Sequence, residues 1–176
     1  MPKTMPGTLL PWTDRAGENA FLLLQTTFSL SGGGLSLSQL TELTGLSATA
    51  IQNWVKRGWV AHPVDKKYED VQVARILLLN LLRPALALEQ IAALLETIRA
   101  EERAELSEVM LYNMLCAGFR RIEMTGTAER SAMERLASNL FIQYGISPAE
   151  PMRRSLTAML LAMAAAQLIR EAETFM

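Results

Sequence analysis

Capping residues and glycines divide residues 35–60 so closely that only short helices fit between them. A serine hydroxyl caps a helix N-terminus and glycine readily adopts the left-handed conformation that ends a helix, so Ser36 and Gly45 bracket one short helix. Ser47 and Gly58 bracket a second helix over 48–57 in the same way. This spacing predicts a helix-turn-helix, two helices that apolar residues lock at a wide angle. The expected locking residues are Leu40, Leu43, Leu46, Ile51 and Trp54.

The outward face of the second helix carries side chains that can hydrogen-bond base edges or phosphates. They are Thr49, Gln52, Asn53 and Lys56. The window 47–67 holds one acid and four cations, a local charge of +3 in a chain whose 17 cations and 18 acids give a formal charge of −1. The four cations are Lys56, Arg57, Lys66 and Lys67. A strongly basic protein that coats nucleic acid is excluded, but a basic patch that binds duplex DNA is not. The alternative is a protein-interaction module that uses the same helix face.

The rest of the chain also reads as helical, which predicts a mainly α fold with a helical bundle after the helix-turn-helix. Pro63 favours an extended 59–64 segment, and residues 65–67 form a turn. No other stretch forms a convincing strand. Apolar periodicity and the positions of glycine and proline predict the remaining helices. Their expected ranges are 16–30, 70–82, 88–96, 105–125, 127–144 and 152–174.

Residues 36–96, about a third of the chain, resemble the N-terminal domain of MerR-type transcription regulators. The resemblance rests on Ser-Gln-Leu-Thr-Glu-Leu-Thr-Gly-Leu-Ser at 38–47, then Ile51, Trp54 and Gly-Trp-Val at 58–60. It continues through Lys-Lys-Tyr-Glu-Asp at 66–70 and the helices expected after it. The sequence is most similar to an uncharacterised bacterial family of MerR-like proteins with a domain of unknown function, in which Lys-Lys-Tyr is typical.

The resemblance implies a non-enzymatic, DNA-binding transcription regulator with a winged helix-turn-helix. Thr49, Gln52 and Asn53 would face the major groove, and Lys56 and Arg57 would lie near phosphates. The wing at 65–68 would place Lys66 and Lys67 at its tip and Tyr68 at its base. The wing lacks the usual Arg-x-Tyr-Arg pattern, and the C-terminal part has no long heptad repeat for a coiled-coil dimer.

Cysteine and histidine counts exclude several kinds of chemistry. With Cys116 and His62 as the single residues of their types, neither an intramolecular disulfide nor a Cys-based zinc site can form. No catalytic, metal-binding or cofactor motif is present, so we expect no enzyme activity and no cofactor. The longest charge-free run near the C-terminus, 155–169, is shorter than the roughly 20 residues that span a membrane. Without a signal peptide as well, the chain is expected to be cytoplasmic.

Three segments are expected: an arm and first helix at 1–34, the helix-turn-helix domain at 35–97, and a helical region at 98–176. Eight of the ten methionines lie in the last segment. Methionine fills irregular cores and also lines adaptable surfaces. The helical region is therefore expected to supply a core and a homodimer seam, or alternatively to hold a small apolar effector. The doublet Arg153-Arg154 is interpreted as the charged start of a surface helix, with contact to DNA or a partner as the alternative.

Overall fold

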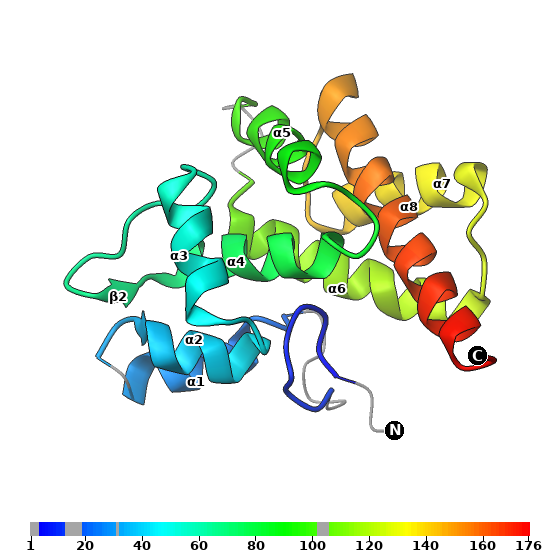
Figure 1. Ribbon diagram of the computed structural model, residues 1–176. Coiled ribbons are helices and arrows are strands. Elements are labelled where there is room, and N and C mark those ends of the chain that lie inside the picture. Colours follow the sequence, from blue (N-terminus) through cyan, green and yellow to red (C-terminus); the bar gives the residue numbers. More distant parts are fainter. Residues whose placement is uncertain (1–3, 13–18, 31, 102–105) are drawn as a thin grey trace. The chain divides into compact units, whose positions relative to one another are not determined.

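The computed structural model describes residues 4–12, 19–30, 32–101 and 106–176, and within them the chain is mainly α (Figure 1). The described elements, in chain order, are α1 (Leu22–Leu30), β1 (Leu35–Ser36), α2 (Leu37–Thr44), α3 (Ala48–Lys56), β2 (Lys67–Tyr68), α4 (Asp70–Leu82), α5 (Leu88–Arg99), α6 (Glu108–Thr125), α7 (Arg130–Gln143) and α8 (Glu150–Glu173). The mainly α class is thus confirmed.

Two compact units divide the chain. Unit 1 contains Met1–Asn80 and Glu108–Asn113, and unit 2 contains Leu81–Ser107 and Met114–Met176. Helices α4 and α6 each supply residues to both units. The functional division into 1–34, 35–97 and 98–176 stays a prediction.

Helix α1 begins later than the apolar pattern suggests. Residues 13–18, the first part of the expected 16–30 helix, lie outside the described residues. Within the described part, Asn19 Oδ1 accepts the Leu22 N–H at 3.1 Å, as an N-cap side chain does. The Phe21 N–H is taken up by the side chain of Asn113, 92 residues further along the chain, at 2.8 Å. A cap and a long-range hydrogen bond therefore set the start of this helix.

The core of unit 1 is built around the aromatic rings of Phe21, Phe28 and Tyr112. Phe21 stacks on Phe28 with ring centroids 5.7 Å apart and meets Tyr112 edge-on at 6.1 Å. The Tyr112 hydroxyl donates to the Pro6 carbonyl at 2.6 Å, so the polar end of this buried ring is satisfied. Leucines and isoleucines of α2, α3 and α4 complete this core; among them are Leu40, Ile51, Ile76 and Leu77.

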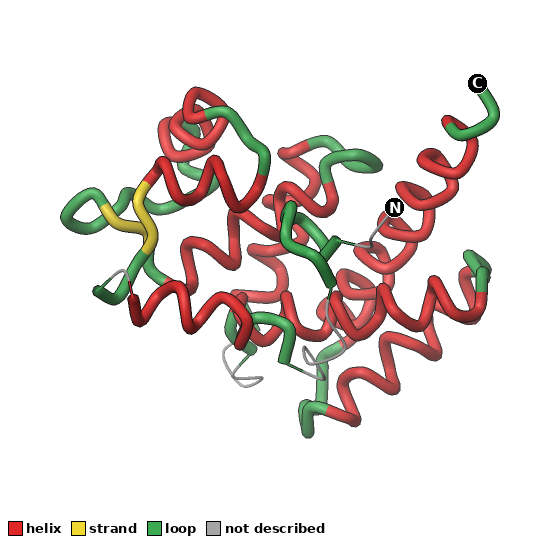
Figure 2. Tube along the Cα trace, turned by 90° about the horizontal axis from the view of Figure 1, so that it is seen from below, coloured by secondary structure: helices red, strands yellow, loops and turns green. Residues whose placement is uncertain are grey.

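The only sheet in the described residues is a pair of two-residue strands, drawn in yellow in Figure 2. β1 and β2 are antiparallel, with Leu35 opposite Tyr68 and Ser36 opposite Lys67. Gly34 allows this approach, because a Cβ atom there would lie 3.0 Å from the Tyr68 carbonyl oxygen. The expected 59–64 segment contains no strand and contributes only an isolated bridge at Val64.

Unit 2 is held together by apolar faces. α7 packs along α8, and α5 packs on α8 as well. Each of α7 and α8 has a buried apolar face; it includes Met133, Leu136, Leu140 and Phe141 on the first and Leu156, Met159, Leu160 and Met163 on the second. Gly118 of α6 brings that helix close to α8, since a Cβ atom at this position would lie 2.5 Å from Leu160 Cδ2. Most of the described methionines of this region are therefore core residues, as is Cys116.

Candidate nucleic-acid interface

The pair α2–α3 has the caps expected from the sequence. Ser36 caps α2 in a reciprocal box: its hydroxyl accepts the Gln39 N–H, while the Gln39 side chain accepts the Ser36 N–H. Gly45 ends α2 in the left-handed conformation, with φ of 72°. Ser47 then caps α3 by accepting the Ala50 N–H at 3.2 Å. The five expected locking residues of the pair are all buried.

Because the buried residues of α3 point toward the core, the opposite face of this helix is exposed to solvent. Thr49, Gln52, Asn53 and Lys56 are all exposed and follow one another at spacings of three, one and three residues. Such spacing places them along one side of the helix. The polar face that the sequence predicts is therefore present as a continuous exposed stripe.

The segment after α3 ends in a two-residue turn. Val64 and Lys67 exchange two backbone hydrogen bonds, of 2.9 and 2.8 Å, around Asp65 and Lys66. Both turn residues have positive φ, 48° for Asp65 and 62° for Lys66. A turn with two positive φ values matches the twist of the flanking strands, and aspartate is among the residues that tolerate it. The expected wing is thus a minimal turn, whose return strand β2 pairs with β1.

The four expected cations differ in their surroundings. Lys56 and Lys66 are exposed. Arg57, also exposed, places its guanidinium 5.2 Å from the ring centroid of Trp59. Lys67 is half-buried, with Nζ 3.5 Å from the Gly32 carbonyl oxygen. Lys66 therefore presents its charge at the tip, whereas Lys67 directs its ammonium group toward the carbonyl oxygen of Gly32.

Gln52, Lys66 and Tyr68 are brought together around one hollow of about 380 Å³. Its other lining residues are apolar: Leu37, Val55 and Pro63. Thr49, Asn53, Lys56, Arg57 and Lys67 do not line it. The candidate surface therefore combines a polar helix stripe with an apolar hollow beside Gln52.

Tyr68 occupies the base of the turn, as the sequence predicts. Its side chain is only 3% exposed, and burial raises the pKa of its hydroxyl above the ordinary value of 10.0. Tyr68 belongs to β2 and forms part of the wall of the hollow. Its main role in the structure is therefore packing.

Three polar side chains of α4, which sequence reasoning did not single out, hydrogen-bond the backbone before and after α3. Gln72 Nε2 donates to the carbonyl oxygens of Ala61 and His62, at 3.1 and 2.6 Å. Asn80 Nδ2 donates at 3.2 Å to the carbonyl oxygen of Thr44, the last residue of α2. Arg75 Nη1 donates to the Trp59 carbonyl oxygen at 3.3 Å. Polar residues within an otherwise apolar helix are the sequence signal that could have identified them.

Arg75 also forms an ion pair that is almost buried. Its guanidinium engages both carboxylate oxygens of Glu108, with Nε at 2.8 and 2.9 Å, and its Nη2 hydrogen-bonds Glu108 Oε1. The two side chains are 11% and 13% exposed. α4 is thereby joined to the first turn of α6 and to the loop that follows α3.

Potential metal ligands do not form a cluster in the described residues. No group of three or more His, Cys, Asp or Glu side chains there is placed to hold a metal ion. His62 is exposed and Cys116 is buried. No helix in the described part of the chain is long and apolar enough to cross a membrane.

Comparison with known proteins gives one match. The model of a family described as a domain of unknown function, DUF1836, matches residues 22–115, more than half of the chain. No curated protein and no solved structure matches. The expected assignment to MerR-like regulators is wrong, because no MerR or other helix-turn-helix family model matches. Its residues at 36–60 encode caps and a glycine turn, which are local solutions for joining two short helices and do not identify one family.

Proposed function

The chain belongs to the DUF1836 family of domains of unknown function, and we propose that it is a non-enzymatic, DNA-binding transcription regulator. In this proposal α2, α3 and the 64–67 turn act as a winged helix-turn-helix. The observation that carries it is the exposed stripe of Thr49, Gln52, Asn53 and Lys56, which continues a surface that also presents Lys66. Amide and hydroxyl groups on one helix face are suited to base edges, and the cations to phosphates.

Each residue has a role in this proposal. Gln52 and Asn53 would read base edges in the major groove, with Thr49 one turn earlier. Lys56, Arg57 and Lys66 would neutralise phosphates, while Lys67 and Tyr68 would shape the turn. The backing by Gln72, Arg75 and Asn80 supports this assignment, since a reading helix must be held rigidly to discriminate between bases.

A homodimer is part of the proposal. Phosphate contacts from Lys56, Arg57 and Lys66 alone would give weak, salt-sensitive binding to DNA. Two copies of the chain on adjacent half-sites would raise the affinity. Support comes from the end of α8 and the residues after it, where large apolar side chains are exposed. Leu168 is 52% exposed, Ile169 47% and Phe175 90%. We propose that this end forms the dimer seam and that the regulator acts in the cytoplasm.

The test is a selection of fragments from a random duplex pool, followed by titration of the best fragment at several salt concentrations. A short palindrome should be enriched, and light scattering should show two chains per duplex. The substitutions Lys56→Ala and Lys66→Ala should each reduce the magnitude of the salt slope by about 0.9. Arg121→Ala, which removes an exposed cation in unit 2, serves as the matched control and should leave the slope unchanged.

Gln52→Ala should relax base preference at one position of each half-site, at a cost of about 1–3 kcal/mol for the preferred base. Affinity for unrelated duplexes should hardly change. A selection that enriches no sequence, with no binding at low salt, contradicts the proposal.

A second candidate is a protein-interaction module on the same surface. It is favoured by the apolar hollow beside Gln52, which is large enough to accept an apolar side chain of a partner. A photo-crosslinking amino acid in place of Gln52 separates the two candidates, because this side chain is exposed and borders the hollow. Crosslinks to duplex DNA support the regulator, and crosslinks to protein alone support the interaction module.

A further inference from the structure

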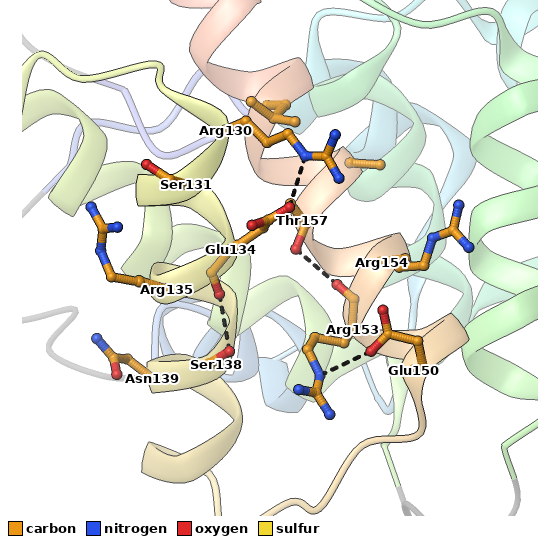
Figure 3. A pocket seen from close by; sticks show the side chains of 12 residues that line it. Arg130, Ser131, Glu134, Arg135, Ser138, Asn139, Glu150, Arg153, Arg154 and Thr157 are labelled. Atoms are coloured by element: carbon orange, nitrogen blue, oxygen red, sulfur yellow. Dashed lines mark hydrogen bonds and ion pairs between the residues drawn. The ribbon is translucent and has the colours of Figure 1, made fainter.

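A second polar surface lies in unit 2, in a groove of about 850 Å³ along the hairpin of α7 and α8 (Figure 3). Four arginines and two glutamates line it, a formal excess of two positive charges. These are Arg130, Glu134 and Arg135 of α7 and Glu150, Arg153 and Arg154 of α8. Because the two helices run past one another, residues about 20 positions apart in the sequence face the same space.

Arg130 and Arg153 reach into the space between the helices, whereas Arg135 and Arg154 lie on its outer flanks (Figure 3). The two inner guanidinium groups each form an ion pair with a glutamate of their own helix. Arg130 Nε lies 2.8 Å from Glu134 Oε1, and Arg153 Nε lies 3.7 Å from Glu150 Oε2.

These ion pairs leave donors available. Each engages the Nε atom of its arginine, and among the described residues neither arginine has a hydrogen bond from its Nη atoms. A guanidinium group has five N–H donors in a planar fork that matches a carboxylate or a phosphate. Each of the two arginines therefore pairs with a glutamate without using all of its donors.

An apolar hollow of about 330 Å³ adjoins the groove and shares Ser138 and Arg153 with it. Its walls come from the end of α7 and the turn before α8; they include Phe141, Ile142, Ile146 and Pro148. Arg153 thus stands where a cationic groove meets an apolar hollow. Small-molecule sites combine an apolar lining with a few polar groups that fix orientation, and these two adjoining spaces show that combination.

We propose that this is a binding site for a small organic anion. The acidic group, a carboxylate or a phosphate, binds the free donors of Arg153, and the apolar part enters the adjoining hollow at Phe141 and Ile146. The site differs from the small apolar effector expected from the methionine content, because the α7–α8 methionines named above are buried in the core while arginines line the open space. The proposal does not depend on DNA binding.

Four probes test it by titration calorimetry with the full chain at constant ionic strength. Phenyl phosphate and phenylacetate carry an apolar group on a phosphate or a carboxylate, and inorganic phosphate and acetate lack it. At least one aryl probe should bind, and more tightly than its inorganic or acetate counterpart by about tenfold or more. The difference between the two aryl probes identifies the acidic group.

Arg153→Gln should weaken that binding by about tenfold or more, since it removes a charge-assisted contact. The matched control is Arg99→Gln. Arg99 is likewise an exposed arginine of unit 2, paired with Glu96 three positions earlier in its own helix, but it does not line the groove. Arg153 is 47% exposed, so its replacement is expected to leave the fold intact, which circular dichroism verifies.

Three results would overturn the inference. They are the absence of heat with every probe up to about 10 mM, equal weakening by Arg153→Gln and Arg99→Gln, and equal affinity for the probes with and without the phenyl group. Equal affinity for the two kinds of probe would show that the hollow takes no part in binding.

Discussion

The surface of α3 and the groove of α7 and α8 are both cationic, but they are assembled in opposite ways. The cations around α3 all come from a single 21-residue window. The arginines of the α7–α8 groove come from two helices and meet because those helices pack together. The first surface is therefore visible in the sequence as a charge cluster, and the second emerges only after folding.

The same contrast holds for what stabilises the two helix pairs. α2 and α3 begin with serine caps that make side-chain hydrogen bonds. α7 and α8 begin after Glu129 and Ala149, neither of which makes a side-chain cap hydrogen bond. Buried apolar faces hold both pairs, but only the first pair also has side-chain caps at its helix starts. This difference predicts which substitutions damage each region.

The largest effect is expected for Phe141→Ala in α7. Phe141 is 1% exposed, and truncation of a buried phenylalanine removes apolar contact and leaves a cavity. The free energy of unfolding should fall by about 3–5 kcal/mol in urea titrations. The adjacent Ile142, 75% exposed, is the control, and Ile142→Ala should change stability by about 0.5 kcal/mol or less. Similar losses for both variants would show that packing does not hold this pair.

A loss of about 3 kcal/mol is expected for Arg75→Met in unit 1. The change removes the partner of the almost buried Glu108 carboxylate. An unpaired buried charge costs more free energy than the intact pair contributes. The control is Arg99→Met, which breaks an exposed pair whose side chains are 70% and 47% accessible and should cost about 1 kcal/mol or less. Urea titrations of both variants make the comparison, and a smaller loss for Arg75→Met than for Arg99→Met contradicts it.

An intermediate effect is expected for Ser36→Ala. Both hydrogen bonds of the capping box rest on this position, and loss of the hydroxyl should lower the free energy of unfolding by about 1 kcal/mol. Glu129→Ala, at the corresponding position before α7, should change it by less than about 0.5 kcal/mol. Thermal or urea unfolding measures both. If the two substitutions cost the same, caps do not distinguish the helix pairs.

The smallest effect is expected for Tyr68→Phe, and it depends on pH. Burial raises the pKa of Tyr68 in the folded chain, so the unfolded chain ionises first as the pH rises past about 10. The contribution of the neutral hydroxyl is complete below that pH and is lost as the pH approaches the folded pKa. The wild type should therefore lose more stability than Tyr68→Phe between about pH 9 and 11. Parallel stability curves for the two proteins would contradict this.

Prediction from sequence succeeded where the determining interaction is local. The ends of α2 and α3 follow from Ser36, Gly45, Ser47 and Gly58, because a cap or a left-handed residue acts within a few positions of itself. The start of α1 was misplaced because one of its determinants, Asn113, is distant in the sequence. The family assignment failed for a related reason, since a capped helix pair is shared by many unrelated chains.

The sequence by itself determined the mainly α fold, the α2–α3 pair and the exposed polar stripe of α3, because helical periodicity and capping are encoded over a few residues. Only the tertiary structure decided the hollow at Gln52, the support from Gln72 and Arg75, and the groove at Arg130 and Arg153. Each of these depends on side chains from different elements meeting in space. Burial and charge at such sites depend on packing between those elements, which short-range sequence patterns do not encode.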